Sequence, residues 1–274
     1  MSTRLKIFLP FGLLIFLVLV IPVCVMLISS LQSMSGGFSL TNYQQIFSSH
    51  YYRGAIYNSI SISIVTSLVS LLVAIIGAWA LTKMSVSTKN ILITVFNMSS
   101  SFAGVPLAFS LIILFGNAGV FKAITSTLHV HDTLNIYSVT GMTFAYTFFE
   151  IPLGIMFFFP VLDSLSREWF EVSNVLGASK IFFVRKVIFP IILPNIVEIF
   201  VLLFANAMGT YETAYALMGN NLVSIPTVIG ALINGELVAN VPLACAFATL
   251  FTVIMTIIVW LGNRITNVKG RSAS

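Results

Sequence analysis

The stretch REWFEVSNVLGASKIFFVRKVIFPIILP, residues 167–194, is the only long segment of this chain that is both amphipathic and charged. Long apolar runs flank it on both sides. Two short helices are predicted here, over 163–176 and 178–189, with Gly177 permitting the turn between them and Pro190 ending the second. Such a patterned loop favours a docking surface for another protein. The alternative is an amphipathic loop that lies on lipid headgroups.

The pattern resembles the cytoplasmic EAA loop of permease subunits in binding-protein-dependent ABC importers. That motif reads Glu-Ala-Ala, three residues, Gly, nine residues, Ile, one residue, Leu-Pro. Glu171, Gly177 and Pro190 fall at the motif's spacing, inside a loop predicted at about 161–194. The chain departs from the motif at four positions, Val172, Ser173, Val187 and Phe189. The close match covers about 20 residues, and the hydropathy pattern extends it loosely over most of the chain.

The resemblance implies that this loop docks on a separate ATPase subunit and passes its movement to the membrane helices. It gives the coupling role to Glu171, Gly177, Ala178, Phe182, Phe183 and Pro190. Glu171 is expected to pair with a basic or polar group of the ATPase. Phe182 and Phe183 are expected to fill a groove on it.

The composition of the 274 residues is that of an integral membrane protein. Hydrophobic residues make up 58% and charged residues only 8%, against roughly 25% charged in globular domains. Six transmembrane helices are predicted in one domain covering 1–274, at about 7–30, 55–82, 91–115, 136–160, 195–217 and 241–263. The first run is too long for a signal-peptide core, and no A-x-A-like site follows it. Gly104 and Pro106 predict a kink or break in the third helix.

The distribution of basic residues predicts the orientation of the chain. Eleven lie in segments that six spans place on one side: Arg4, Lys6, Lys83, Lys89, Arg167, Lys180, Arg185, Lys186, Arg264, Lys269 and Arg271. The other side holds Arg53 and Lys122. Positive residues gather in the cytoplasm, so both termini and the 161–194 loop are predicted there. This asymmetry also accounts for the net charge of +5 without a nucleic-acid partner.

The sequence lacks the usual enzyme signatures. It has no G-x-x-x-x-G-K-[ST] phosphate loop, no G-x-S-x-G and no H-E-x-x-H. His129, His131 and Asp132 have a spacing that suits neither a helix face nor a closed zinc set, so they are interpreted as a surface loop and no metal site is predicted. The resemblance implies a non-catalytic subunit without a cofactor of its own, with ATP and Mg on the partner ATPase.

Three acids fall inside the predicted spans, at Glu150, Glu198 and Glu212, where charge is costly and usually faces a bundle interior or a wet path. Glu198 is close enough to the inner start of helix five to reach the interface. In that helix, Asn206, Gly209, Thr210 and Thr213 are spaced to share one face. We therefore name Glu212, Tyr211, Asn206 and Glu150 as candidate translocation-pathway residues. The alternative is that Glu212 pairs with an inter-helix donor and that Tyr211 and Tyr215 belong to an interfacial belt.

The chain is accordingly interpreted as an all-α permease subunit of a type I ABC importer in a bacterial inner membrane. The resemblance implies two ATPase subunits, a second permease of the same or a homologous chain, and an external substrate-binding protein. The stretch GTYETAYALMG, residues 209–219, looks like the branch that handles polyamines, thiamine, phosphonates or ferric iron. The rival classes are an ion-coupled secondary transporter that uses the three glutamates, and a membrane assembly protein without transport activity.

Overall fold

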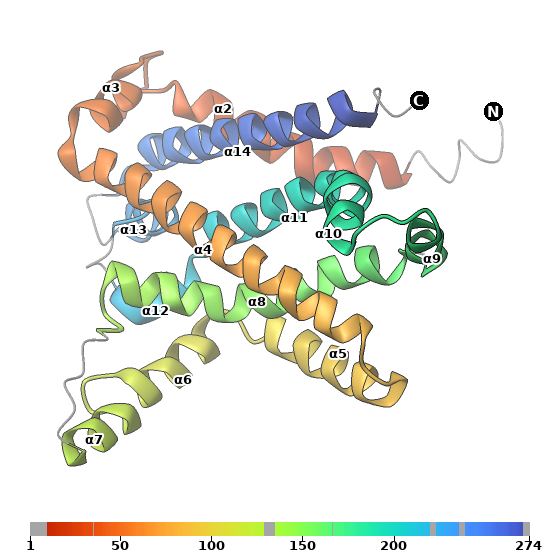
Figure 1. Cartoon of the computed structure of the whole chain (residues 1–274). Helices are drawn as coiled ribbons and strands as arrows, with labels where there is room; N and C mark the ends of the chain where they lie inside the picture. Colours follow the sequence, from red (N-terminus) through yellow and green to blue (C-terminus); the bar gives the residue numbers. More distant parts are fainter. Residues whose placement is uncertain are drawn as a thin grey trace. The chain divides into compact units, whose positions relative to one another are not determined.

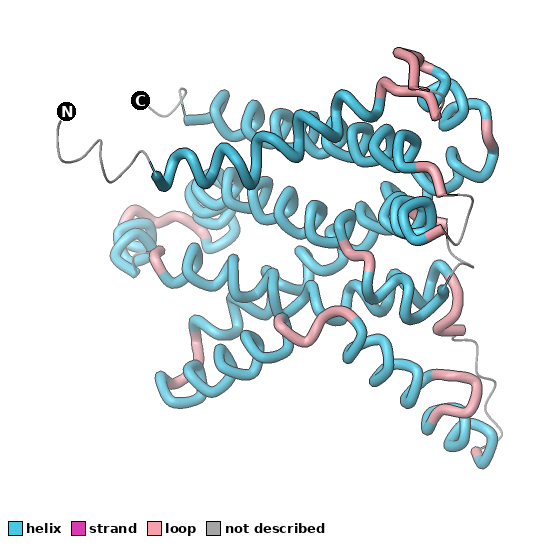
Figure 2. Tube along the Cα trace, turned by 180° about the vertical axis from the view of Figure 1, so that it is seen from behind, coloured by secondary structure: helices cyan, strands magenta, loops and turns pink. Residues whose placement is uncertain are grey.

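A computed structural model describes residues 10–34, 36–128, 135–165, 167–219, 223–235 and 239–270. In these ranges helix is the only regular structure (Figure 2), apart from an isolated bridge between Gln32 and Phe38. Six helical stretches are long and apolar enough to cross a bilayer: Pro10–Ser30, His50–Thr82, Val105–Thr127, Val139–Asp163, Lys180–Gly209 and Val241–Thr266. The predicted all-α membrane fold with six spans is confirmed. His129, His131 and Asp132 lie outside the described residues.

The chain divides into two compact units. Figure 1 labels the helices that belong to them. The first, Met1–Asn58 with Val223–Met255, contains the π-helical turn η1 (Phe16–Val20), α2 (Ile21–Ser30), α3 (Thr41–Ser48) and α13 (Ile225–Asn234), with the first parts of α4 (His50–Thr82) and α14 (Val241–Gly270). Asn42 fastens α3 because its Nδ2 donates to the carbonyl oxygens of Ser30 (3.0 Å) and Gln32 (2.8 Å). These two bonds hold α3 to the end of α2 and the segment that follows it.

The second unit, Ser59–Leu222 with Thr256–Ser274, contains the remaining elements. These are α5 (Val86–Ser100), α6 (Val105–Phe115), α7 (Val120–Thr127), α8 (Val139–Asp163), α9 (Arg167–Val175), α10 (Lys180–Phe183), the π-helical turn η2 (Val184–Ile188), α11 (Phe189–Gly209) and α12 (Glu212–Met218). A Cβ added to Gly154 of α8 would lie 2.8 Å from the Cβ of Ala74 on α4 and 3.4 Å from Leu203 Cδ1 on α11. Small residues thus let three spanning helices approach closely.

The predicted third span, 91–115, is wrong because two helices occupy it. α5 ends at Ser100 and α6 begins at Val105, with Gly104 between them at φ 83° and ψ −147°. A helix cannot continue through this conformation, and Pro106 suits the first turn of α6, where no N–H is needed. The break predicted from Gly104 and Pro106 is confirmed, and the third candidate span is Val105–Thr127, which includes the turn at 116–119.

The predicted fifth span, 195–217, is also wrong, and Pro190 does not end a helix. The backbone is helical without interruption from Lys180 to Gly209 and then breaks at Thr210 and Tyr211, before α12. The helix passes Pro190 by means of η2, in which the N–H of Phe189 donates to the carbonyl of Val184, five residues back. The helix expected over 163–176 begins later as α9, because Asp163 is the last residue of α8.

The same device occurs near the start of the chain. The turn η1 ends where the N–H of Ile21 donates to the carbonyl of Phe16, and Pro22 follows at once. A proline in a helix removes one N–H and its ring crowds the carbonyl four residues back. Widening the preceding turn to π geometry accommodates both effects, so the helix continues instead of ending.

Candidate functional site

The loop after α8 folds as a helix–turn–helix that we call the docking segment, residues 167–188. Its turn is a Schellman motif: the N–H of Ala178 donates to the Ser173 carbonyl (3.0 Å) and that of Gly177 to the Asn174 carbonyl (3.0 Å). Gly177 takes φ 73°, which L side chains rarely adopt. The Ser179 side chain then caps α10 by accepting the N–H of Phe182 at 3.2 Å. The turn predicted at Gly177 is confirmed.

The docking segment exposes a large apolar patch. Its members share exposed fractions above one half: Val172 (58%), Val175 (87%), Leu176 (80%), Ile181 (80%), Phe182 (55%) and Val184 (55%). In Figure 1, α9 lies past the end of α8, away from the spanning helices of its unit. An exposed apolar patch of this kind marks an interaction surface.

The six predicted coupling residues differ in how exposed they are. Glu171, Gly177, Phe182 and Pro190 are exposed, and Ala178 is half-buried. Phe183 is only 6% exposed, so its ring packs within the chain. Nearby, Lys89 Nζ pairs with Asp163 Oδ1 at 3.0 Å and lies 5.0 Å from the centre of the Phe159 ring, which ties the start of α5 to the end of α8.

The four predicted pathway residues also fall into two environments. Asn206, on α11, and Glu212, at the start of α12, are exposed, and Tyr211 between these helices is half-buried. The ring of Tyr211 stacks on that of Tyr215, with centroids 5.5 Å apart and planes at 22°. Glu150 on α8 is 0% exposed. A solute passing along the surface of this chain would meet the first three and not Glu150.

The continuous polar face expected over 206–213 does not exist. Thr210 has φ −74° and ψ 108°, so the helix register is lost between Gly209 and Glu212. The hydroxyl of Tyr146, on α8, donates to the Thr210 carbonyl at 2.8 Å and satisfies an acceptor that the break sets free.

The two helix breaks of this unit meet each other. The N–H of Gly104 donates to Oγ1 of Thr213 at 3.0 Å, across 109 residues of sequence. A Cβ on Gly104 would lie 2.5 Å from Glu212 Oε2, so the carboxylate lies at the N-terminal end of α6. The partial positive charge of a helix N-terminus favours an acid there, which gives Glu212 a structural contact in addition to its exposure.

Sequence reasoning missed Tyr146 and the role of Thr213 as the partner of Gly104. Gly104 and Pro106 indicated a break, but no local pattern says that a hydroxyl from α12 fills it. Tyr146 is followed four residues later by Glu150, whose carboxyl oxygens have no hydrogen-bond partner among the described residues. The hydroxyls of Thr66 and Ser70, on the buried face of α4, also have no hydrogen-bond partner among the described residues. Each of these three side chains is fully buried within the helix packing.

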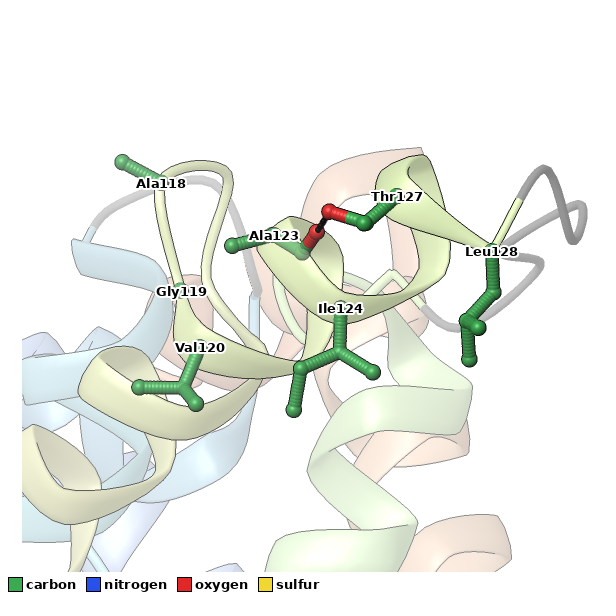
Figure 3. Close-up of a pocket in the computed structure, with 7 residues that line it drawn as sticks. All are labelled: Ala118, Gly119, Val120, Ala123, Ile124, Thr127 and Leu128. Carbon is green, nitrogen blue, oxygen red and sulfur yellow. Dashed lines mark hydrogen bonds between the residues drawn. The ribbon is translucent and has the colours of Figure 1, made fainter.

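A hollow of ≈ 550 Å³ lies along α7 (Figure 3). Figure 3 shows Val120, Ile124 and Leu128 pointing to one side of this helix, while Thr127 Oγ1 donates to the Ala123 carbonyl at 2.9 Å. The lining residues carry no charge, so the hollow offers nothing to hold a charged solute. Among the described residues no group of three His, Cys, Asp or Glu side chains could hold a metal ion.

Comparisons with known proteins agree on one family. Residues 70–267 match the family model described as "Binding-protein-dependent transport system inner membrane component". The chain is 26% identical over 165 residues to the probable sulfate transport system permease protein cysT of Helicosporidium sp. subsp. Simulium jonesii, covering 59% of each chain. It is 21% identical over 237 residues to the spermidine/putrescine transport system permease protein PotB of Escherichia coli K12, covering 85% of each.

Coverage of the relatives is partial. The match spans 64% of the sulfoquinovosyl glycerol permease protein SmoH of Agrobacterium fabrum and 54% of the PotC homolog of Mycoplasma genitalium. Among solved structures, a bacterial ABC transporter involved in the import of the acidic polysaccharide alginate superposes with a TM-score of 0.81 at 16% identity, over 96% of this chain and 94% of that one. This likeness shows that the two chains share a fold.

Proposed function

Because the chain belongs to the family of binding-protein-dependent transport system inner membrane components, we propose that it is the permease subunit of an ATP-driven importer. The observation that carries the proposal is the exposed apolar docking segment, which fits a groove on a separate ATPase. The chain has no phosphate-binding loop, so ATP and Mg belong to that partner and this subunit is non-catalytic.

The helix that follows the docking segment supports a coupling role. From Lys180 the backbone is helical to Gly209, so a displacement of α10 passes into α11 through one rod. At about 1.5 Å per residue, Phe182 lies about 36 Å from Asn206 along that rod. Movement of an ATPase surface against Phe182 and Leu176 would thereby shift the exposed side chains of α11 and the break that follows them.

The proposed assembly contains two ATPase subunits, a second permease and an external binding protein. The second permease is the same chain or a homologue. We place the protein in a bacterial inner membrane with both termini and the docking segment in the cytoplasm. The support is the excess of basic residues on the side of the docking segment.

Replacing Gly177 by Val tests the coupling role. Gly177 has positive φ and open space around it, so valine would distort the Schellman turn without a collision elsewhere. In reconstituted complex we expect ATP hydrolysis to persist while uptake falls at least tenfold. Gly36→Val is the matched control, because Gly36 has φ 90° and equally open surroundings on the predicted outer side. Wild-type uptake by Gly177→Val with the ATPase bound would refute the proposal.

For the substrate we propose a small organic cation such as a polyamine. The support is the exposed Glu212 beside the stacked rings of Tyr211 and Tyr215, since carboxylates and aromatic faces both attract cations. Relatives named for sulfate and for spermidine/putrescine differ in charge, so their names do not decide the matter. Glu212→Gln is expected to lower uptake of a polyamine with assembly and basal ATP hydrolysis intact, and Glu198→Gln serves as the control for loss of one exposed carboxylate. Unchanged uptake over the full substrate range would remove Glu212 from the pathway.

One observation favours a second candidate, an ion-coupled secondary transporter. Glu150 is fully buried in a spanning helix without a hydrogen-bond partner among the described residues, as a coupling site could be. Uptake by proteoliposomes with an imposed proton or sodium gradient and no ATP distinguishes an ion-coupled transporter from an ATP-driven importer. Uptake that follows the gradient without nucleotide would favour this candidate over the importer.

A further inference from the structure

All three tryptophans of the chain lie toward one end of the second unit. Trp79 is on the last turn of α4, Trp260 is near the end of α14, and Trp169 is on α9. The ends of α4 and α14 point to the same side of this unit as α9 in Figure 1. The topology predicted from the sequence places the excess of basic residues on that side, so we assign it to the cytoplasmic leaflet.

Two of these tryptophans have the same neighbour at the same spacing. Lys83, four residues after Trp79, has its Nζ 3.5 Å from the indole centroid, and Arg264, four residues after Trp260, has its Cζ 5.1 Å from that ring. Four residues along a helix bring side chains onto one face. Each indole is more than half exposed, at 54% for Trp79 and 55% for Trp260, and both cations are exposed. The surface of the chain therefore presents two matched pairs of an open ring and a cation.

Among the described residues, neither cation has an acidic partner. The ion pair that the described residues show is Lys89–Asp163, and it leaves Lys83 and Arg264 without an acidic partner. At the edge of a bilayer, an unpaired cation held against an indole faces a layer of phosphates. The indole N–H is a further donor to the same oxygens, and the ring itself suits the headgroup level.

We propose that Trp79–Lys83 and Trp260–Arg264 are two binding sites for the headgroups of anionic phospholipids in the cytoplasmic leaflet. The cation meets the phosphate charge, the indole N–H donates to a phosphate oxygen, and the apolar part of the ring lies along the upper acyl chain. A zwitterionic lipid offers the same phosphate with its own cation attached, so the sites prefer a lipid with net negative charge. The inference needs only a chain that spans a bilayer and does not depend on transport.

The tryptophan content makes a direct test possible. In the full chain carrying Trp169→Phe, the two proposed sites hold the only indoles. The variant is reconstituted in nanodiscs of equal parts phosphatidylglycerol and phosphatidylcholine, with bromine on the acyl chains of one lipid or the other. We expect brominated phosphatidylglycerol to quench tryptophan fluorescence at least twofold more than brominated phosphatidylcholine.

Charge variants then tie the preference to these residues. Lys83→Gln with Arg264→Gln is expected to make the two lipids equal quenchers, whereas Lys83→Arg keeps the preference. Lys89→Gln is the matched control, since this cation already pairs with Asp163 and its loss should leave the preference unchanged. Adding 10 mM inorganic phosphate should not relieve quenching. Relief would show that the sites bind a soluble anion and would overturn the proposal of lipid binding.

Three further results would overturn the proposal. Equal quenching by both lipids in the Trp169→Phe chain would show that the sites do not select charge. Absence of quenching by either lipid would show that protein covers the indoles. A preference that survives Lys83→Gln with Arg264→Gln would place its source elsewhere. Uptake by the assembled complex is measured separately, so a failure of the importer proposal leaves this result standing.

Discussion

Two regions of the molecule each depend on a glycine with positive φ: the docking segment, and the contact between the helix breaks at Gly104 and Thr210. The surroundings of the two glycines are opposite. Gly177 lies in an open turn with nothing within 4 Å of its missing Cβ, and all bonds of that turn join residues within five of each other. Gly104 is buried, and its contacts come from Glu212 and Thr213 on another helix. The exposed turn of the docking segment is built from local bonds, whereas the helix breaks inside the bundle are held by distant residues. We therefore expect changes in the two regions to affect different measurements.

The largest expected effect separates two neighbours in the docking segment. Phe183→Ala removes a ring that is 6% exposed and should lower the free energy of unfolding by about 3–5 kcal/mol. Phe182→Ala removes a ring that is 55% exposed and should change it by less than about 0.5 kcal/mol, while weakening capture of the ATPase. Dye-monitored thermal unfolding in detergent and a pull-down with the ATPase measure the two effects. Equal losses of stability would contradict the difference in burial between Phe183 and Phe182.

The next largest effect is the expected difference in stability between variants of the two glycines. Gly104→Ala should destabilise the chain by about 2–3 kcal/mol, because φ 83° with ψ −147° is a region open essentially to glycine alone. Gly177→Ala should cost about 1 kcal/mol, since open space surrounds it and only the positive φ is unfavourable. Thermal unfolding of both variants gives the order. If Gly104→Ala with Glu212→Ala recovers the stability of Glu212→Ala alone, a collision with the carboxylate and not the backbone is the cause.

The smallest effect is expected at the ion pair between these regions. Asp163→Asn should cost less than about 1 kcal/mol, because half of the Asp163 side chain is exposed and such pairs contribute little. The difference from the unchanged chain should shrink in 1 M salt, where exposed charges are screened. Thermal unfolding at low and high salt measures it. A difference that is large and independent of salt would mean that Asp163 holds α8 in place by another contact.

The sequence was sufficient for features that local pattern encodes. Apolar length predicted six spans, and the spacing of Glu171, Gly177 and Pro190 predicted the family and the turn. The break at Gly104 was likewise predicted from the glycine and Pro106. Each of these depends on the conformational preference of one residue or on the thickness of a bilayer.

What the sequence could not provide was how the helix ends are placed. Residues 91–115 were predicted as one span and 195–217 as another, since apolar content alone does not reveal where a break or a π turn falls. Pro190 was predicted to end a helix, although the widened turn before it lets the helix continue. The bond from Gly104 to Thr213 joins residues too far apart for any pattern to connect. The distinction between Phe182 and Phe183 depends on packing in the same way.

The π turn η2 holds one residue more than an α-helix would need to cover the same height. Deleting Val187 would therefore let the stretch 184–189 close as ordinary α-helix while the helices before and after it stay in phase. The same deletion within α11 would instead turn everything beyond it by about 100° about the axis, since an α-helix has about 3.6 residues per turn. In evolutionary terms η2 is a position where a lineage can lose one residue without rotating the docking segment relative to the membrane helices. A loss within α11 would need a compensating change elsewhere.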